Sequence, residues 1–238
     1  ETPRWAVFHF TSEDNPHLSK VALDEITGDM SALNYRLEIL AEDIDDDPRA
    51  LWTRETLSKT RVISHPELDR IVVAIDPPGS TTGECGIIVA GSAWKGDVIH
   101  GYVLEDASIQ GSPATWAGQA VARYNHYAAD RLVAERNFGG DMVESTLKSA
   151  DPTIPVKMLT ASRGKIARAE PIAALYEKGR CHHVGEFQRL EDEQCSFVQT
   201  RSKSMPSPNR LDALVWGMSE LMLEYCATEL GSIEIPML

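Results

Sequence analysis

The sequence predicts an α/β domain with a mixed β-sheet flanked by helices. Two observations support this fold class. From Arg70 onward, short apolar runs alternate with segments of helical periodicity, and the first three runs follow one another at hairpin spacing. Strands joined by short turns and strands separated by helices then share one sheet. The chain of 238 residues is long enough for one such domain with an appended segment.

The elements of this domain follow in order along the chain. Ile71–Ile75 is an apolar run suited to a strand buried on both faces, and Ser112 is the expected cap of a helix with Pro113 at its first position. The full order is strands at 71–75, 86–91 and 98–104, a helix at 113–128, a strand at 132–135, a helix at 139–149, a strand at 156–159, a helix at 165–177 that ends at Gly179, and helices at 187–197 and 210–225. This order is the one expected of a ribonuclease H-like fold, assigned here to residues 66–238.

Residues 1–65 are predicted to form a separate leading segment. Helical spacing is plausible at 18–26 and 31–41, and no β-rich core is evident. The acidic run at 42–47 is interpreted as a solvated surface. A boundary near Ser64–Pro66 is favoured because an alternating apolar stretch begins immediately afterwards.

Composition and charge limit the function. No apolar run approaches the roughly 18 residues of a membrane helix, and no signal-peptide pattern starts the chain, so we expect neither a membrane partner nor secretion. The four cysteines include no CxxC pair and are expected to be free thiols of a reducing compartment. The net charge is −13, and only residues 151–209 are net basic, with nine bases against seven acids. Any phosphate-contacting surface is therefore expected in that stretch.

Three acidic residues stand where a carboxylate could do chemistry. Asp76 directly follows the first buried strand, at the end of the sheet where ligands collect in α/β folds. Glu135 closes a second strand, and Asp212 lies in the first turn of a helix whose neighbouring residues are apolar. Taken singly, each has an ordinary structural explanation as a turn, strand-end or helix-dipole residue. Their grouping is what suggests a catalytic site.

Hydrolysis of a phosphodiester supplies the reason for that grouping. Two divalent ions roughly 3.5–4 Å apart can provide the nucleophilic water and stabilise the leaving oxygen, and Mg²⁺ or Mn²⁺ takes carboxylate ligands. We therefore expect the carboxylates of Asp76, Glu135 and Asp212 within about 8 Å of one another on one side of the sheet. Glu84 is a candidate auxiliary metal ligand, although an ordinary strand-edge role explains it equally well.

Several stretches together resemble the nuclease domain of tailed-phage and prophage large terminases, over roughly residues 70–225. The stretches are VVAIDPPGS…ECGIIVAG, LVAERNFGGDMV, GKIARAEPIAALYEKGRCHHVGEFQRLEDE and SPNRLDALVWGMSEL. The resemblance implies that Asp76, Glu135 and Asp212 are the three metal-binding acids. It further implies a metal-dependent endonuclease that cuts concatemeric double-stranded viral DNA.

The same resemblance implies the setting of the activity. Residues 1–65 look like the segment that joins the family's packaging ATPase to its nuclease, and the ATPase itself is missing because no GxxxxGK[ST] loop occurs. Implied partners are the small terminase subunit, the portal protein and that ATPase domain, in the host bacterial cytoplasm during virion assembly.

Basic residues near the acids are candidate DNA contacts, although each could also be a solvated surface cation. They are Arg163, Lys165, Arg168, Arg201 and Lys203. Three rival functions remain open. They are a Holliday-junction resolvase or transposase core of the same fold, an actin- or sugar-kinase-like nucleotide-binding domain, and a non-catalytic docking module.

Overall fold

A computed structural model describes residues 10–27, 35, 39–41, 50–79, 83–136, 140–161, 164–198 and 207–224. The chain divides into two compact units, Glu1–Pro48 and Arg49–Leu238. In the first unit, the short 3₁₀ helix η1 spans Ser12–Asp14 and α1 spans Lys20–Thr27. Most of the helix expected at 31–41 lies outside the described residues. The larger unit begins earlier than the boundary expected near residue 65, because α3 (Arg54–Thr60) packs against other elements of that unit.

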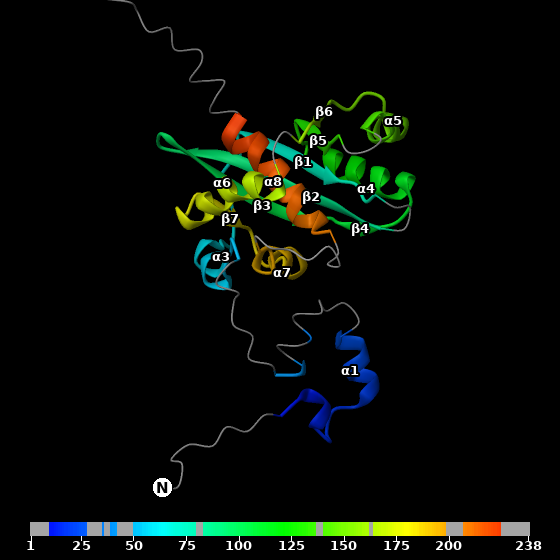
Figure 1. Cartoon of the computed structure of the whole chain (residues 1–238), viewed down its shortest axis with the longest axis vertical. Helices are drawn as coiled ribbons and strands as arrows, with labels where there is room; N and C mark the ends of the chain where they lie inside the picture. The colour runs from blue at the N-terminus through cyan, green and yellow to red at the C-terminus, as the bar shows by residue number, and fades with distance from the viewer. Residues whose placement is uncertain are drawn as a thin grey trace, which may run out of the picture. The chain divides into compact units, whose positions relative to one another are not determined.

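The larger unit is built on one mixed sheet of seven strands (Figure 1). The main path runs β6-β5-β1-β2-β3-β7, and β4 pairs with β2. The β1–β2 and β2–β3 pairs are antiparallel, whereas β1–β5, β5–β6 and β3–β7 are parallel. The strands are β1 (Arg70–Asp76), β2 (Glu84–Lys95), β3 (Val98–Asp106), β4 (Ile109–Gln110), β5 (Arg131–Glu135), β6 (Val156–Leu159) and β7 (Cys181–His183). The predicted mixed sheet is thus confirmed.

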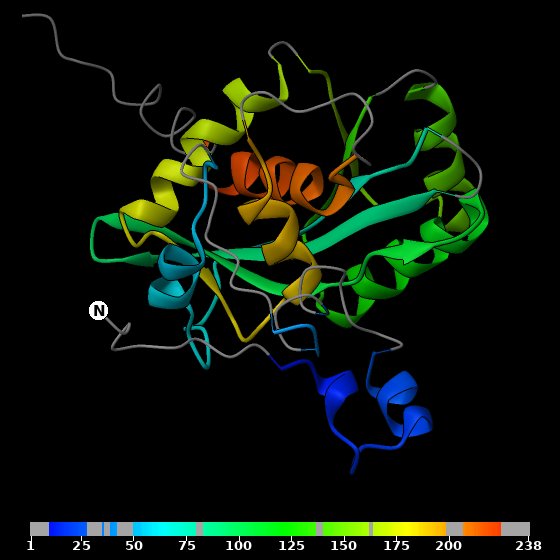
Figure 2. The ribbon, with the colours of Figure 1, turned by 60° about the horizontal axis from the view of Figure 1, so that its bottom comes forward.

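Helices cover both faces of the sheet (Figures 1 and 2). Alternate residues of β1 serve the two sides: Val72 and Ala74 join the core beneath α3, α6, α7 and α8, while Val73 and Ile75 join the core beneath α4 and α5. This is why the strand reads as a continuous apolar run. The helices are α4 (Pro113–His126), α5 (Gly140–Ala150), α6 (Lys165–Glu177), α7 (Gln188–Cys195) and α8 (Asn209–Ser219), and α8 continues as the π-helical turn η3 (Glu220–Glu224).

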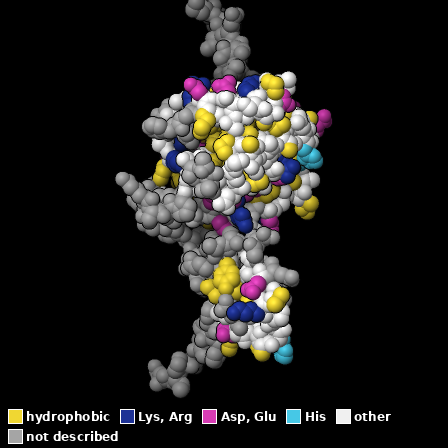
Figure 3. Space-filling model, turned by 90° about the vertical axis from the view of Figure 1, so that its right-hand side faces the viewer, with side chains coloured by type: hydrophobic (Ala, Val, Ile, Leu, Met, Phe, Trp, Pro, Cys, Tyr) yellow, Lys and Arg dark blue, Asp and Glu magenta, His cyan; other side chains and the backbone are white. Residues whose placement is uncertain are grey.

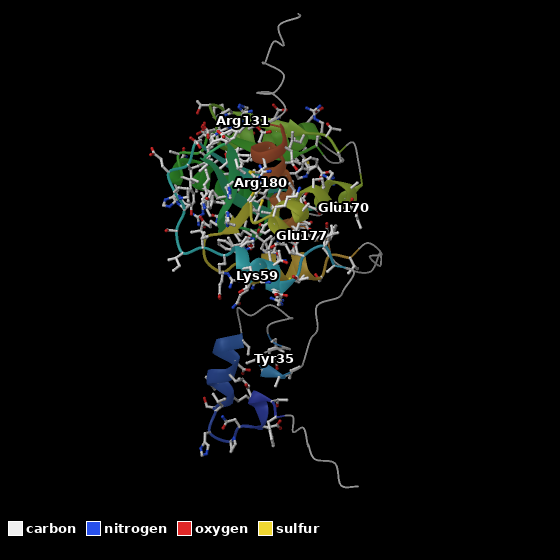
Figure 4. The ribbon with its side chains drawn as sticks, turned by 90° about the vertical axis from the view of Figure 1, so that its left-hand side faces the viewer. Tyr35, Lys59, Arg131, Glu170, Glu177 and Arg180 are labelled. Atoms are coloured by element: carbon white, nitrogen blue, oxygen red, sulfur yellow. The ribbon has the colours of Figure 1, made fainter. Side chains whose placement is uncertain are left out.

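The sequence signals for helix ends are confirmed where the structure describes them. The Ser112 hydroxyl accepts a hydrogen bond from the Thr115 amide at the start of α4, and Gly179 has a φ of 64° just after α6. On α6, Glu170 and Glu177 lie on the exposed face, while the opposite face is buried (Figure 4).

The described cysteines are thiols, as expected from the sequence, and the surface shows no concentration of bases on the face that Figure 3 presents. In the view of Figure 3, Lys and Arg side chains are scattered among acidic and uncharged ones and form no single basic patch. Cys85, Cys181 and Cys195 are buried thiols that form no disulfide, and burial raises the pKa of Cys181 to about 12. No helix within the described part of the chain is long and apolar enough to cross a bilayer.

Candidate active site

Two of the predicted acids lie at the ends of neighbouring strands. β1 and β5 are parallel, with Ile75 paired to Ala134, so Asp76 and Glu135 follow at the same edge of the sheet. Side chains alternate along a strand, and both residues fall on the side of the sheet that α8 covers. Asp76 is 3% exposed and Glu135 is 6% exposed. The topology therefore buries two carboxylates beneath one helix.

Helix α8 brings the third acid to the same place. Its apolar residues face the sheet, and Gly217 allows close contact, because a Cβ atom there would lie 3.1 Å from the Ala74 Cβ. Gly86, the β2 partner of Asp76, has even less room: a Cβ would lie 1.9 Å from the Asn209 carbonyl oxygen. The first turn of α8, which carries buried Asp212, is thus pressed directly onto the start of β2.

The three carboxylates interact electrostatically. Burial and then the negative charges of Asp212 and Glu135 hold the pKa of Asp76 well above its ordinary range. Burial also raises the pKa of Asp212, although Lys165 opposes the rise. The structure thus brings the predicted acids together into one acid-rich site.

Side chains of α6 and α8 hold these carboxylates. Lys165 donates hydrogen bonds to Asp212 Oδ2 and, at 3.1 Å, to the Ser207 hydroxyl. The Trp216 indole Nε1 donates to Glu135 Oε2 at 3.1 Å. The Arg168 guanidinium lies 4.2 Å from the centroid of the Trp216 ring, and one of its nitrogens is 3.7 Å from Glu135 Oε1.

Of the predicted DNA contacts, two therefore face the acidic site in this structure. Lys165 and Arg168 are directed at carboxylates, whereas Arg163, Arg201 and Lys203 lie outside the described residues. A role of these residues in binding DNA stays a prediction.

Two of the three acids, Asp76 and Glu135, open onto a cleft of about 440 Å³. Asp76, Glu135 and Lys165 line it together with Glu84 and Glu193. The Glu84 carboxylate is paired with both terminal nitrogens of Arg210, so its predicted role as an auxiliary metal ligand also stays a prediction.

Sequence reasoning missed Glu193, because α7 reads as a polar helix in which every acid looks solvated. Burial raises the pKa of this carboxyl to about 7, even though hydrogen bonds from the Leu211 amide and Arg210 oppose the rise.

The donor chemistry fits hard divalent ions, which select carboxylate oxygen. Among the described residues, no group of three or more His, Cys, Asp or Glu is already disposed to hold an ion. In this structure Lys165 and Arg168 supply the positive charge beside Asp212 and Glu135. Burial, and then the charges of its acidic neighbours, raise the pKa of Asp76, and a bound cation would favour the ionised form of this carboxyl.

Residues 73–221 match the family described as Terminase RNaseH-like domain. The chain belongs to this terminase family. The resemblance read from the sequence motifs and the ribonuclease H-like fold are both confirmed, and the matched residues include all three acids.

Solved structures share the fold of this terminase domain at low sequence identity. The nuclease domain of the large terminase subunit of bacterial virus Sf6 is 16% identical with a TM-score of 0.52, covering 71% of this chain and 98% of that one. A mutant of that domain with manganese and beta-thujaplicinol is 13% identical with a TM-score of 0.55, and covers the same shares of the two chains.

A large terminase from a thermophilic bacteriophage is 14% identical with a TM-score of 0.55, and the match covers 90% of this chain. The match spans about half, 55%, of that phage protein, which has also been solved in complex with ATP-gamma-S. Comparison of the sequence with curated proteins gives no match.

Proposed function

We propose that this terminase domain is a metal-dependent endonuclease that cuts concatemeric double-stranded viral DNA by two-metal phosphodiester hydrolysis. The observation that carries the proposal is the convergence of Asp76, Glu135 and Asp212, from two strands and one helix, in a buried site that opens onto a cleft. The manganese seen with the Sf6 nuclease domain supports the choice of ion.

The three acids would together hold the metal ions in this proposal. Two Mg²⁺ or Mn²⁺ ions held by them would supply the nucleophilic water and stabilise the leaving oxygen. Asp76 would be a ligand whose negative charge a bound cation offsets strongly, because burial and the charges of both other acids raise its pKa. Glu135 is oriented by the Trp216 indole, which restricts its rotation at the strand end.

The basic residues compensate the acids and then engage the substrate. Lys165 now neutralises Asp212, so a divalent ion must compete with its ammonium group for that carboxylate. A displaced Lys165 could bind a DNA phosphate, together with the other bases predicted from the sequence. Phosphate contacts carry no base information, so cleavage should be largely insensitive to sequence.

The wider setting is also a proposal. The large terminase of the thermophilic bacteriophage, which has been solved with ATP-gamma-S and extends well beyond the part matched by this chain, supports an ATPase in the same polypeptide. Residues 1–65 would then belong to the connection between the two. The small terminase subunit and the portal are the proposed partners, in the bacterial host cytoplasm during virion assembly.

Digestion of supercoiled plasmid, with and without Mn²⁺, tests this function. We expect nicked and linear DNA only with Mn²⁺, and none with Asp212→Asn. The matched control is Asp97→Asn, an exposed acid in the turn between β2 and β3, which should cut like the wild type. Normal cleavage by Asp212→Asn would refute the site. A wild type that neither cuts DNA nor binds Mn²⁺ by calorimetry would instead support the docking-module alternative.

A further inference from the structure

The first turn of α8 lacks a capping side chain of its own. Its N-cap residue is Pro208, which makes no side-chain hydrogen bond, yet the first N–H groups of a helix need partners from outside it. One partner comes from α7, because the Leu211 amide donates to Glu193 Oε2 at 3.0 Å. The positive end of the helix dipole also favours a carboxylate here. Glu193 therefore caps α8 from a neighbouring helix.

The second oxygen of Glu193 ties the same turn to the sheet. Glu193 Oε1 accepts a hydrogen bond at 3.3 Å from Arg210, which is buried. Arg210 also donates to Asp106 Oδ2 of β3 at 2.9 Å and to Glu84 Oε1 of β2 at 2.6 Å. Charge-assisted hydrogen bonds of this kind are the strong ones in proteins. Through Arg210, α7, α8 and two strands share one polar network.

Helix α7 is itself a fixed support for this contact. Leu190 is fully buried, and Glu191 pairs with Arg61 at 2.7 Å and with His183 Nδ1 at 3.0 Å. These contacts leave Glu193 free to face α8 and the cleft. The position of α7 can therefore be passed on to the start of α8.

We propose that Glu193 is a positioning residue for Asp212: by holding the first turn of α8, it sets where the Asp212 carboxylate lies relative to Asp76 and Glu135. This inference rests on the proposed function, because the exact placement of Asp212 matters only if the site binds catalytic metals. Leu211, whose amide Glu193 caps, is the immediate neighbour of Asp212. A shift of about 1 Å at a reacting group can cost on the order of a hundredfold in rate.

Two variants separate the hydrogen bond from the charge. Glu193→Gln and Glu193→Ala both remove the carboxylate charge, but only glutamine keeps an oxygen that can accept from the Leu211 amide. Two quantities are measured on the whole chain: hydrogen exchange at the Leu211 amide, and Mn²⁺-dependent plasmid cleavage. For alanine we expect amide protection to fall on the order of tenfold and cleavage roughly 10- to 100-fold. Glutamine should keep both within about threefold of the wild type. Glu177→Ala on the exposed face of α6 is the control.

The outcomes discriminate. If the Leu211 amide keeps its protection in the alanine variant, or loses equal protection in both variants, Glu193 does not cap α8 through this hydrogen bond. Loss of Leu211 amide protection together with wild-type cleavage would refute the positioning role. If the alanine variant does not fold, Glu193→Asp replaces it, because aspartate keeps the charge but is too short to reach Leu211. The same two quantities, amide exchange and cleavage, are then measured on that variant. A wild-type protein that fails to cut DNA would refute the proposed function. Hydrogen exchange at the Leu211 amide would still show whether Glu193 caps α8.

Discussion

Gly86 is the position where one added carbon should disturb the site most. It pairs with Asp76 in the sheet and faces the first turn of α8, and an alanine Cβ there would lie 1.9 Å from the Asn209 carbonyl oxygen and 2.3 Å from its carbon. Real Cβ contacts are essentially never shorter than 3.0 Å, so the first turn of α8 must move by about an ångström. The obstacle is backbone, which cannot turn aside as a flexible side chain would.

The size of the effect follows from that displacement. Overpacking a core costs about 1–3 kcal/mol, which lowers the melting temperature of a domain of this size by about 2–4 °C for each kcal/mol. An ångström of movement at Asp212 should also reduce Mn²⁺-dependent cleavage on the order of a hundredfold. Both effects are measured on purified Gly86→Ala, by thermal unfolding and by plasmid digestion.

A second glycine provides the control. Gly118 is an exposed residue within α4, and a Cβ there would meet nothing within 4 Å. Because glycine costs a helix interior about 0.5–1 kcal/mol relative to alanine, Gly118→Ala should melt at the same temperature or higher and cut DNA normally. If Gly86→Ala matched this control in both stability and cleavage, the close packing of α8 on β2 would not be what places Asp212.

Three further outcomes are expected. The raised pKa of Asp76 means that its ionised form destabilises the folded domain, so Asp76→Asn should have a higher melting temperature than the wild type in EDTA at pH 8. This difference in melting temperature should shrink as the pH falls toward about 4, the ordinary pKa of an aspartic acid side chain. A lower melting temperature for Asp76→Asn at pH 8 would contradict this prediction. Lys165→Met should bind Mn²⁺ more tightly by calorimetry, since no ammonium group competes for Asp212, and unchanged or weaker binding would argue against that competition. Glu191 is buried, yet hydrogen bonds from His183 and Arg61 lower its pKa to about 2. Glu191→Gln should therefore lose about 2–3 kcal/mol of unfolding free energy at pH 7, and this loss should become smaller below about pH 4.5. Equal stability of the variant and the wild type at pH 7 would show that these two hydrogen-bonded contacts contribute little.

The regular elements could be predicted because their signals are local. The strand at 71–75 is a run of apolar residues, and the helix at 113–128 carries both a cap and a proline at its first position. The sequence analysis did not find α3, β4 or β7. Each has seven residues or fewer, and β7 consists of Cys181–His183, whose pairing with β3 is set by distant parts of the chain. Such elements depend on tertiary contacts that no short window contains.

The site was predictable as far as its acids and no further. Asp76 and Glu135 stand at strand ends, where topology gives them a shared edge. The partners of these acids carry no such signal. Lys165 and Arg168 were interpreted as bases directed at DNA, and Glu193 was not singled out, because the sequence alone does not show which way a charged side chain faces.

Helix α8 is the element that turns separate acids into one site, and its two ends explain how. At the far end, buried Glu220 pairs with Lys157 at 2.6 Å and with Arg131 (Figure 4) at 3.4 Å, which ties the helix to β6 and β5. At the near end, Arg210 binds carboxylates of β2, β3 and α7. A buried charge without a partner is costly, so these pairs fix the helix in one register across the sheet. Asp212 lies four residues before Trp216, whose indole orients Glu135. Asp212 and Trp216 therefore project from the same face of α8, and the ion pairs at its two ends keep that face in place.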